Sequence, residues 1–445
     1  MGRMRSAQLV RACLLPSALL ALGALAGCGD DDAPPVPPRD AGPPRDAGPP
    51  RDGAIVGDAG DVDGAVSDGG ERPDGSIGPS TCTVATADDL FRLSTDLIER
   101  DRTPTVAANA SGFAVAWSET RGAEDVFVWT LPPGAATGTE TQVTMDSAIS
   151  RDPAISANGT GWAVAWYDNS TAGYEIYAQA LATSGAPMGS PTRLTTNMAR
   201  DDSPALLSFG SGLLAAYVTE DLMASSRTAS TRLLSATTAP SAAATALTMP
   251  PLAPTTLVLS PLMDGAGLGW AQTSAGVAQA YLQRVGMDGH ALGAVQTLST
   301  EANSDGSIFL ATTSSGGAAV FGVRISGVRP EVRLRPVDGM GVPSGPERII
   351  TPAPELGQDA SIAAFAGGYV VAYRAAPDGT LTTPTIRLAL VDSLGGVISR
   401  LDLDTTEMRG GRTSIAVAPD GRILVAWSES TDTKTIIRAA RITCE

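Results

Sequence analysis

Apolar residues recur in short runs along residues 102–444, and clusters of glycine, proline, asparagine and aspartate separate the runs. In one unit the runs cover 153–157, 161–168, 174–181 and 192–196. Short apolar or alternating runs cut by turn-forming residues are typical of β-strands. The 161–168 run is apolar on both faces, which indicates a strand that is covered on both sides. The pattern therefore predicts an all-β domain built from units of four short strands.

The unit is repeated seven times. An apolar run that ends in an aromatic residue returns at spacings of 49–54 residues, and another apolar run begins 13 residues before each aromatic. The aromatic positions are Trp117, Trp166, Tyr217, Trp270, Phe321, Tyr373 and Trp427. Four strands in about 50 residues are typical of a β-propeller blade, in which sheets stack around a central channel. The repeat predicts a seven-bladed β-propeller of four-stranded blades.

The two ends of the repeat predict how the ring closes. The seventh unit ends with the run 435–442 and lacks a fourth strand, while the segment 90–95 stands before the first unit. That segment is similar to the fourth strands at 192–196 and 296–300. We expect it to complete the last blade, because a closed ring leaves no sheet edge open.

Residues 1–27 have the pattern of an export signal. A basic start precedes an apolar run that is too short to span a membrane stably. The run ends in Leu25-Ala26-Gly27-Cys28, which resembles the lipobox of bacterial lipoproteins. The resemblance implies cleavage before Cys28, acylation of its sulfur and attachment to the cell envelope. The expected location is the periplasmic or surface face of the outer membrane. The alternative is an ordinary signal with an incidental cysteine.

Residues 28–80 have the composition of a disordered tether. They repeat Pro-Pro-Arg-Asp, carry 12 acidic and 4 basic residues, and contain no aromatic side chain. Such a segment buries too little apolar surface to fold, and proline and like charges extend it. We expect a spacer between the anchor and a folded domain at 81–445. The alternative is a calcium loop around Asp58, Asp61, Asp63 and Asp68, but it lacks the EF-hand glutamate at position 12.

Cysteine usage gives a further test of closure. Cys13 lies in the signal and Cys28 is assigned to acylation, which leaves Cys82 and Cys444. Exported proteins fold in an oxidising compartment, and ring closure brings the two ends of the domain together. We therefore expect a disulfide between Cys82 and Cys444. Two free thiols are the alternative.

Charge and composition exclude several classes of function. The net charge is −16, which argues against nucleic acid as a partner. His290 is the single histidine and lies in a polar turn, so histidine-based metal sites are excluded and a catalytic triad would depend on that residue. Neither a Cys/His ligand spacing nor a glycine-rich phosphate loop is present. We expect no metal and no cofactor.

The repeat has a known counterpart. Gly161-Trp-Ala-Val-Ala-Trp-Tyr-Asp168, followed by Glu175-Ile-Tyr-Ala-Gln-Ala-Leu181 and Gly185, resembles a degenerate repeat of large secreted bacterial proteins. The likeness is clear in the first two units and faint in the third and fifth. It supports the fold alone, because that repeat type carries no agreed activity.

Acidic residues gather in two classes of loop. In a propeller the loops that join strand four to the next strand one share a face with the loops that join strands two and three, so both surround one channel mouth. The candidate ligand-binding residues are Asp101, Glu119, Asp152, Asp168, Asp202, Glu220, Asp305, Asp359 and Glu429. They predict a site for a cation, a sugar or a basic peptide. The alternative is turn capping and Arg–Asp pairing.

These features predict a monomeric, lipid-anchored propeller that acts as a non-catalytic binding or scaffold module at the cell envelope. Its expected partners are the membrane, through the anchor, and an envelope protein or a glycan. No catalytic residue is assigned. The alternative is a propeller glycosidase or polysaccharide lyase that acts on extracellular glycans, since the carboxylate separation such enzymes need is a property of the fold. A purely structural envelope protein is a third class.

Overall fold

The computed structural model describes residues 81–84, 89–94 and 104–445, the last range with gaps at 171–172, 225, 248–255, 275–276, 301–303, 314–315, 326–328, 377–378, 380–383, 404–409 and 431–434. The chain divides into two units at 1–66 and 67–445. The first unit, which contains the predicted signal and most of the predicted tether, lies outside the described residues. No helix among the described residues is long and apolar enough to cross a membrane.

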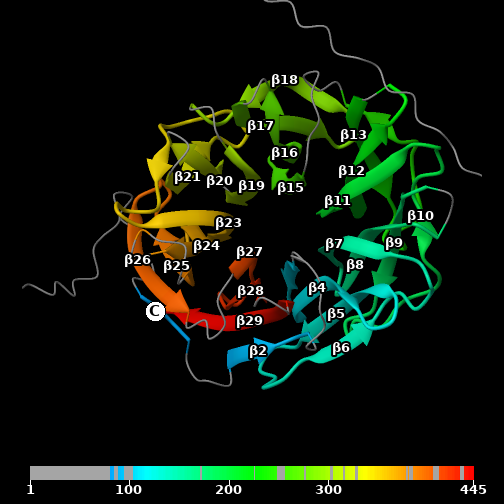
Figure 1. Ribbon diagram of the computed structural model, residues 1–445, viewed down its shortest axis with the longest axis horizontal. Helices are drawn as coiled ribbons and strands as arrows, with labels where there is room; N and C mark the ends of the chain where they lie inside the picture. The colour runs from blue at the N-terminus through cyan, green and yellow to red at the C-terminus, as the bar shows by residue number, and fades with distance from the viewer. Residues whose placement is uncertain are drawn as a thin grey trace, which may run out of the picture. The chain divides into compact units, whose positions relative to one another are not determined.

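The second unit is a closed ring of seven antiparallel sheets (Figure 1). Six of them have four strands each, and the chain passes from the innermost strand outward. The blades are β3 (Thr105–Asn109), β4 (Gly112–Thr120), β5 (Glu124–Leu131), β6 (Thr139–Gln142); β7 (Ser150–Asn158), β8 (Gly161–Asp168), β9 (Glu175–Leu181), β10 (Thr192–Arg193); β11 (Arg200–Phe209), β12 (Gly212–Asp221), β13 (Ser226–Leu234), β14 (Thr245–Ala246); β15 (Leu257–Leu262), β16 (Gly265–Ser274), β17 (Val277–Gly286), β18 (Ala291–Thr297); β19 (Ser304–Thr313), β20 (Gly316–Ile325), β21 (Arg329–Val337), β22 (Arg348–Ile349); and β23 (Leu356–Phe365), β24 (Gly368–Ala376), β25 (Thr385–Val391), β26 (Val397–Leu403). The predicted seven-bladed propeller is confirmed.

The seventh blade combines the two ends of the domain. Strands β27 (Gly410–Val417), β28 (Ile423–Ser430) and β29 (Thr435–Cys444) come from the C-terminus. Strands β1 (Cys82–Thr83) and β2 (Leu90–Arg92) both pair with β29 from the N-terminal side. Cys82 lies opposite Cys444 in this ladder, and the two form a disulfide with a Cα–Cα distance of 4.0 Å. Closure by the N-terminal segment is therefore confirmed, and so is the disulfide.

Side-chain chemistry explains why this segment fits as a fourth strand. In blade 2 the Thr195 hydroxyl accepts the N–H of Ile176 at 2.9 Å, and in blade 4 the Ser299 hydroxyl accepts that of Ala280 at 3.0 Å. Ser94 does the same for Ile437 at 2.7 Å. The borrowed strand thus reproduces a hydrogen bond that four other blades make within their own repeats.

Glycine begins the second strand in six blades because the third strand passes very close to it. A Cβ at Gly112 would lie 2.1 Å from the carbonyl oxygen of Leu131, and one at Gly212 would lie 2.1 Å from that of Leu234. A backbone oxygen cannot move away at low cost, so any side chain would push the strands apart. This is the physical reason for the glycine that precedes the apolar run in each of these units.

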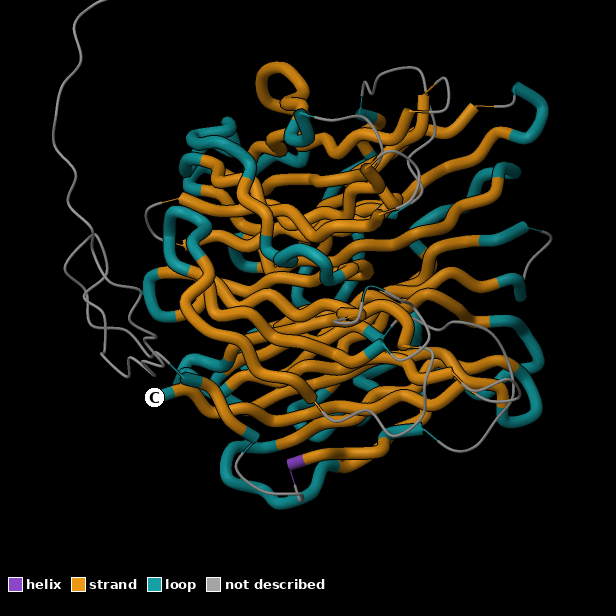
Figure 2. The backbone as a smooth tube through the Cα atoms, turned by 60° about the vertical axis from the view of Figure 1, so that its left-hand side comes forward, coloured by secondary structure: helices purple, strands orange, loops and turns teal. Residues whose placement is uncertain are grey.

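The core lies between the sheets. The second strands are buried on both faces, as predicted, and residues Phe113–Ala116 of β4 have no exposed surface. Apolar clusters run from one blade into the next, and the borrowed segment takes part, since the rings of Phe91 and Trp129 lie 5.0 Å apart. The side view in Figure 2 shows the strands running between loops at the two faces of the ring. The loops of the channel-mouth face, which join strands two to three and four to one, frame the candidate site.

Candidate functional site

The inner strands of all seven blades surround a cavity of about 430 Å³ on the axis. Apolar side chains contribute to its lining and include Ile155, Leu259, Leu310 and Ile362. Polar side chains line it where the inner strands begin, on the channel-mouth face. The cavity falls within the size range of small-molecule sites, which combine an apolar lining with a few placed polar groups.

A β-bulge shapes this end of the inner strands. The ladder between the first and second strands shifts register between Arg151 and Ala154 in blade 2, and equivalent shifts occur in blades 3, 5, 6 and 7. The bulged residues Asp152, Ser203 and Asp359 have φ values of +47°, +53° and +54°. Non-glycine residues seldom adopt this conformation, and bulges re-aim side chains near functional sites.

The ladder registers show that the position held by Asp152 is polar in every blade. In each blade the equivalent residue directly precedes the one that lies opposite the repeated aromatic of the second strand. The equivalents of Asp152 are Thr103, Ser203, Thr256, Ser307, Asp359 and Arg412. We call these seven residues the polar ring. Asp152, Ser203, Thr256 and Arg412 line the cavity. Thr103 lies outside the described residues, and the side chain of Ser307 is not described.

Arg412 is the one cation of the polar ring. It is half-buried, and its guanidinium makes no hydrogen bond or ion pair with any described residue. Asp359, by contrast, lies 3.1 Å from Arg374. Guanidinium groups bind carboxylates through two parallel hydrogen bonds, so Arg412 offers a site for an anion. Asp152 places a carboxylate in the same cavity, and burial followed by the charge of Asp152 raises the pKa of Tyr167 to about 12.

Sequence reasoning placed Arg412 among the charged residues of the loops that join strand four to strand one, but not among the candidate ligand-binding residues. Counting 13 residues back from the repeated aromatic, which is Trp427 in the last unit, leads to Ser414. The hairpin turn at 418–422 is longer in that blade, so Thr413, not Ser414, lies opposite Trp427. Allowing one extra residue in this Pro-Asp-Gly turn would have aligned Arg412 with Asp152.

Two of the predicted ligand-binding carboxylates are buried within blades. Glu119 is 6% exposed, accepts the indole N–H of Trp117 at 3.0 Å and pairs with Arg121 at 2.8 Å. Glu429 is 1% exposed and accepts the indole N–H of Trp427 at 2.9 Å and the Arg438 Nε–H at 2.6 Å. These contacts match the alternative of internal pairing, because both carboxylates already have strong donors.

Some of the other predicted carboxylates pair with neighbouring side chains, and others lie in the polar ring. Asp168 accepts the Ser150 hydroxyl at 2.7 Å, and Asp202 pairs with Arg227 at 2.8 Å. Glu220 is half-buried opposite Arg200 in the ladder. Only Asp152 and Asp359 of the predicted set belong to the polar ring. Asp101 lies outside the described residues, and the side chain of Asp305 is not described.

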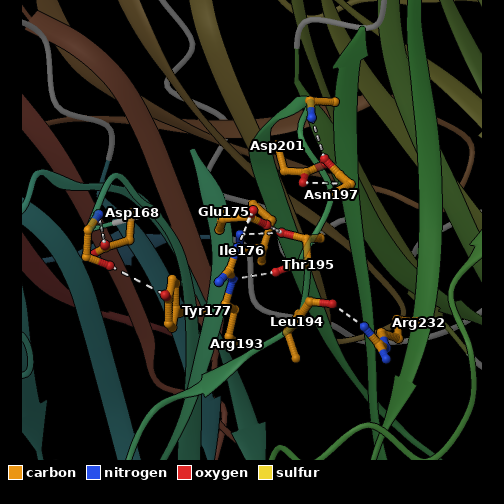
Figure 3. A network of polar contacts seen from close by, with 12 residues as sticks. Asp168, Glu175, Ile176, Tyr177, Arg193, Leu194, Thr195, Asn197, Asp201 and Arg232 are labelled. Atoms are coloured by element: carbon orange, nitrogen blue, oxygen red, sulfur yellow. Dashed lines mark hydrogen bonds and ion pairs between the residues drawn. The ribbon is translucent and has the colours of Figure 1, made fainter. Parts of the chain in front are cut away.

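A buried polar cluster joins blades 2 and 3 (Figure 3). Glu175 is 1% exposed and binds Arg193 at 2.5 Å and the hydroxyl of Thr195. Asp201 is fully buried and accepts the Asn197 amide at 2.8 Å and the hydroxyl of Thr219. Burial, and to a smaller extent the charge of Glu175, raises the pKa of Asp201. The carboxylates are satisfied by groups of both blades, so the cluster fastens the blades together.

The described residues contain neither a cluster of metal-ligating side chains nor a buried histidine. No group of three or more histidine, cysteine, aspartate or glutamate residues there is arranged to hold a metal ion. His290 is exposed in its turn, where its backbone N–H donates to Asp288 at 3.0 Å.

No protein-family model and no curated protein matches this chain. Solved structures with similar folds include a subtype N10 neuraminidase-like protein of A/little yellow-shouldered bat/Guatemala/060/2010, at 12% identity and TM-score 0.42, covering 81% of this chain and 98% of that one. The NanB sialidase of Streptococcus pneumoniae is similar at 10% identity and TM-score 0.46, with coverages of 79% and 70%. An α-L-arabinanase of Penicillium chrysogenum, solved with arabinobiose, is similar at 12% identity and TM-score 0.45, with coverages of 80% and 96%.

These comparisons correct one expectation from the sequence. A non-catalytic binding or scaffold module was expected, whereas the propellers similar to this chain include a sialidase and an arabinanase, which are glycosidases. The prediction of a non-catalytic module is therefore wrong, because the fold does not imply the absence of catalysis. At 10–12% identity the comparisons show the propeller fold alone.

Proposed function

We propose that the propeller recognises a small hydroxylated carboxylate at the polar ring. The observation that carries the proposal is Arg412, a guanidinium that lines the axial cavity without a partner among the described residues. The protein has a net charge of −16, so a single unneutralised cation at a cavity marks a specific place for an anion.

The lining of the cavity defines the ligand class. The hydroxyls of Ser203 and Thr256 and the carboxylate of Asp152 can exchange hydrogen bonds with ligand hydroxyl groups. Apolar residues of the inner strands offer a surface for C–H groups. A cavity of about 430 Å³ admits a ligand of monosaccharide size. The class is therefore a sugar acid or another small polyhydroxy acid.

Calorimetric titration with D-glucuronate and D-glucose tests this assignment, because the two sugars differ by the carboxylate. We expect glucuronate to bind and glucose to bind at least tenfold more weakly. Arg412→Ala should weaken glucuronate binding about 10- to 100-fold, the value of a charge-assisted hydrogen bond of about 1.5–3 kcal/mol. Arg412→Lys should retain part of the affinity, since it keeps the charge and loses the fork geometry.

Arg422→Ala is the matched control. Arg422 is paired with Asp420 at 2.6 Å in a turn on the opposite face, so its removal should leave glucuronate affinity unchanged. Equal affinity in Arg412→Ala and the parent chain, or equal affinity for glucuronate and glucose, would refute the proposal. Product analysis of the same mixtures measures whether the Asp152 carboxylate acts on the bound sugar.

We also propose that the chain is an envelope lipoprotein anchored through Cys28. The support is the ending Leu25-Ala26-Gly27-Cys28 after a short apolar run, followed by the acidic, proline-rich segment 29–80 that separates it from the propeller. Two or three acyl chains hold a protein firmly, since each buried CH₂ contributes about 0.8 kcal/mol. Cell fractionation and mass spectrometry of the mature N-terminus test this. Cys28→Ala should release the protein from membranes, and a membrane-bound Cys28→Ala chain would contradict the assignment.

A further inference from the structure

All seven methionines that the structure describes are exposed. Their exposures run from 38% to 103%, and they are Met145, Met188, Met198, Met223, Met263, Met287 and Met340. No methionine belongs to the buried core in the described part of the chain. This is unusual because methionine, being flexible and polarizable, is commonly used to fill irregular gaps in cores. Here alanine, valine, leucine and aromatic residues fill the core instead.

The exposed methionines occupy turns at both faces of the ring. Met145 and Met198 lie in loops that join one blade to the next, and Met223 follows β12. The others lie in hairpin turns of the opposite face. All seven are outside the strands, so the thioether sulfurs belong to the parts of the fold that packing constrains least.

The indoles and the cysteine sulfurs of the described domain are shielded. Trp117, Trp162, Trp270 and Trp427 are at most 1% exposed, and the two cysteines of the described domain are joined in a disulfide. An oxidant that arrives from solvent therefore meets thioethers before it meets indoles or thiols. Met249 and Met408 lie outside the described residues.

We propose that the propeller is a methionine-based oxidant sink whose seven exposed thioethers are sulfoxidation sites for two-electron oxidants such as hypochlorous acid. In each reaction the sulfur lone pair attacks chlorine and hydroxide leaves, and water then displaces chloride from sulfur to form the S=O group. The net change converts R₂S and HOCl to R₂SO, H⁺ and Cl⁻, so sulfur loses two electrons and chlorine gains them. A sulfoxide is polar, and it disrupts a structure chiefly when the methionine is packed inside it. At these exposed turns it leaves the core intact.

Stepwise titration of the mature chain with hypochlorous acid tests the proposal. Peptide mass spectrometry should show sulfoxide at the seven residues before any change at tryptophan. The melting temperature of the oxidised chain should stay within about 2 °C of the starting value, because sulfoxides at exposed turns leave the core packing unchanged. A melting temperature that falls steeply as the first methionines are oxidised would overturn the proposal, and so would tryptophan oxidation at the same stage.

Two variants serve as controls. Replacing all seven methionines by leucine should preserve the melting temperature and remove the corresponding oxidant consumption. Leu388→Met places a thioether in the core, where Leu388 is 1% exposed and a leucine-to-methionine exchange is tolerated. That core sulfur should remain unoxidised while the surface sulfurs react. Equal oxidation of the introduced core sulfur and the surface methionines, or unchanged oxidant consumption in the seven-leucine chain, would show that exposure does not direct the chemistry.

Discussion

At the residue scale, two of the carboxylates that follow the repeated aromatic residues accept hydrogen bonds from buried indole N–H groups. Trp117 and Trp427 donate to Glu119 and Glu429, two residues further along the strand. Trp270 makes the same contact with the amide oxygen of Gln272 at 3.2 Å. A buried indole N–H needs an acceptor, and either a carboxylate or an amide supplies one.

Glu429 allows this role to be measured. Glu429→Ala should destabilise the protein by about 2–3 kcal/mol, because it leaves the Trp427 N–H buried without its acceptor and removes the partner of Arg438. Glu429→Gln should cost about 1 kcal/mol, since it keeps an acceptor as Gln272 does. Urea denaturation of both variants gives the two values. Equal losses would mean that the charge pair, not the indole acceptor, sets the contribution.

Asp201 provides a pH-dependent test. Its folded-state pKa is raised above the ordinary value of 3.8, mainly by burial. Between those two values the folded state binds more protons than the unfolded state, so this residue lowers stability as the pH rises through that window, and the loss persists above it. Asp201→Asn removes this dependence. The stability of the variant relative to the parent should therefore increase from about pH 4 to pH 7, as measured by thermal unfolding. A constant difference across that range would show that Asp201 titrates alike in both states.

At the scale of the strand, Ser94 should contribute as much as its equivalent in a continuous blade. Ser94 accepts the N–H of Ile437, and Ser299 accepts that of Ala280, and both serines are buried. Ser94→Ala and Ser299→Ala should each cost about 1–3 kcal/mol, because each leaves a buried backbone N–H without its acceptor. Paired denaturation curves test this. A silent Ser94→Ala beside a costly Ser299→Ala would show that the borrowed strand is held mainly by other contacts.

Strands and closure could be predicted from the sequence because they depend on patterns that repeat. The glycine that begins six of the second strands, the aromatic that ends each apolar run and the similarity of 90–95 to other fourth strands all reflect contacts that recur from blade to blade. Each pattern was therefore observed several times in one chain. The missing fourth strand of the last unit then left one place for segment 90–95.

The site could be predicted only in part, because it depends on register. Asp152 and Asp359 were recognised as acidic loop residues, but a one-residue change in a hairpin separated Arg412 from its equivalents. Charge in a loop also does not reveal its partner. Glu119 and Glu429 have the same sequence context as exposed acids. Only their distances to tryptophan and arginine show that their carboxylates already accept hydrogen bonds within the blade.

At the scale of the whole molecule, the disulfide should stabilise the ring through the unfolded state. Cys82 and Cys444 are separated by 362 residues, so breaking the bond enlarges the unfolded ensemble greatly. Replacing both by serine should cost at most about 6 kcal/mol in the loop-entropy description. Denaturation of the double variant and of the reduced parent chain should agree. A loss in the variant without a loss on reduction would point to local packing at the serines.

The borrowed segment should matter more than the disulfide alone, because it joins the last blade to the first. Phe91 and Leu93 are at most 9% exposed, and their cluster includes Trp129 of blade 1 and Ala439 of blade 7. Burying two such side chains contributes about 3–6 kcal/mol, beyond the hydrogen bonds and the disulfide. Domains of ordinary stability have about 5–15 kcal/mol in total, so a chain that begins at residue 96 should lose cooperative unfolding or aggregate, whereas one that begins at residue 81 should fold. Thermal unfolding and size-exclusion chromatography compare the two chains. If both unfold at the same temperature as monomers, the ring does not depend on its N-terminal strand, and stacking of the other blades alone must hold it closed.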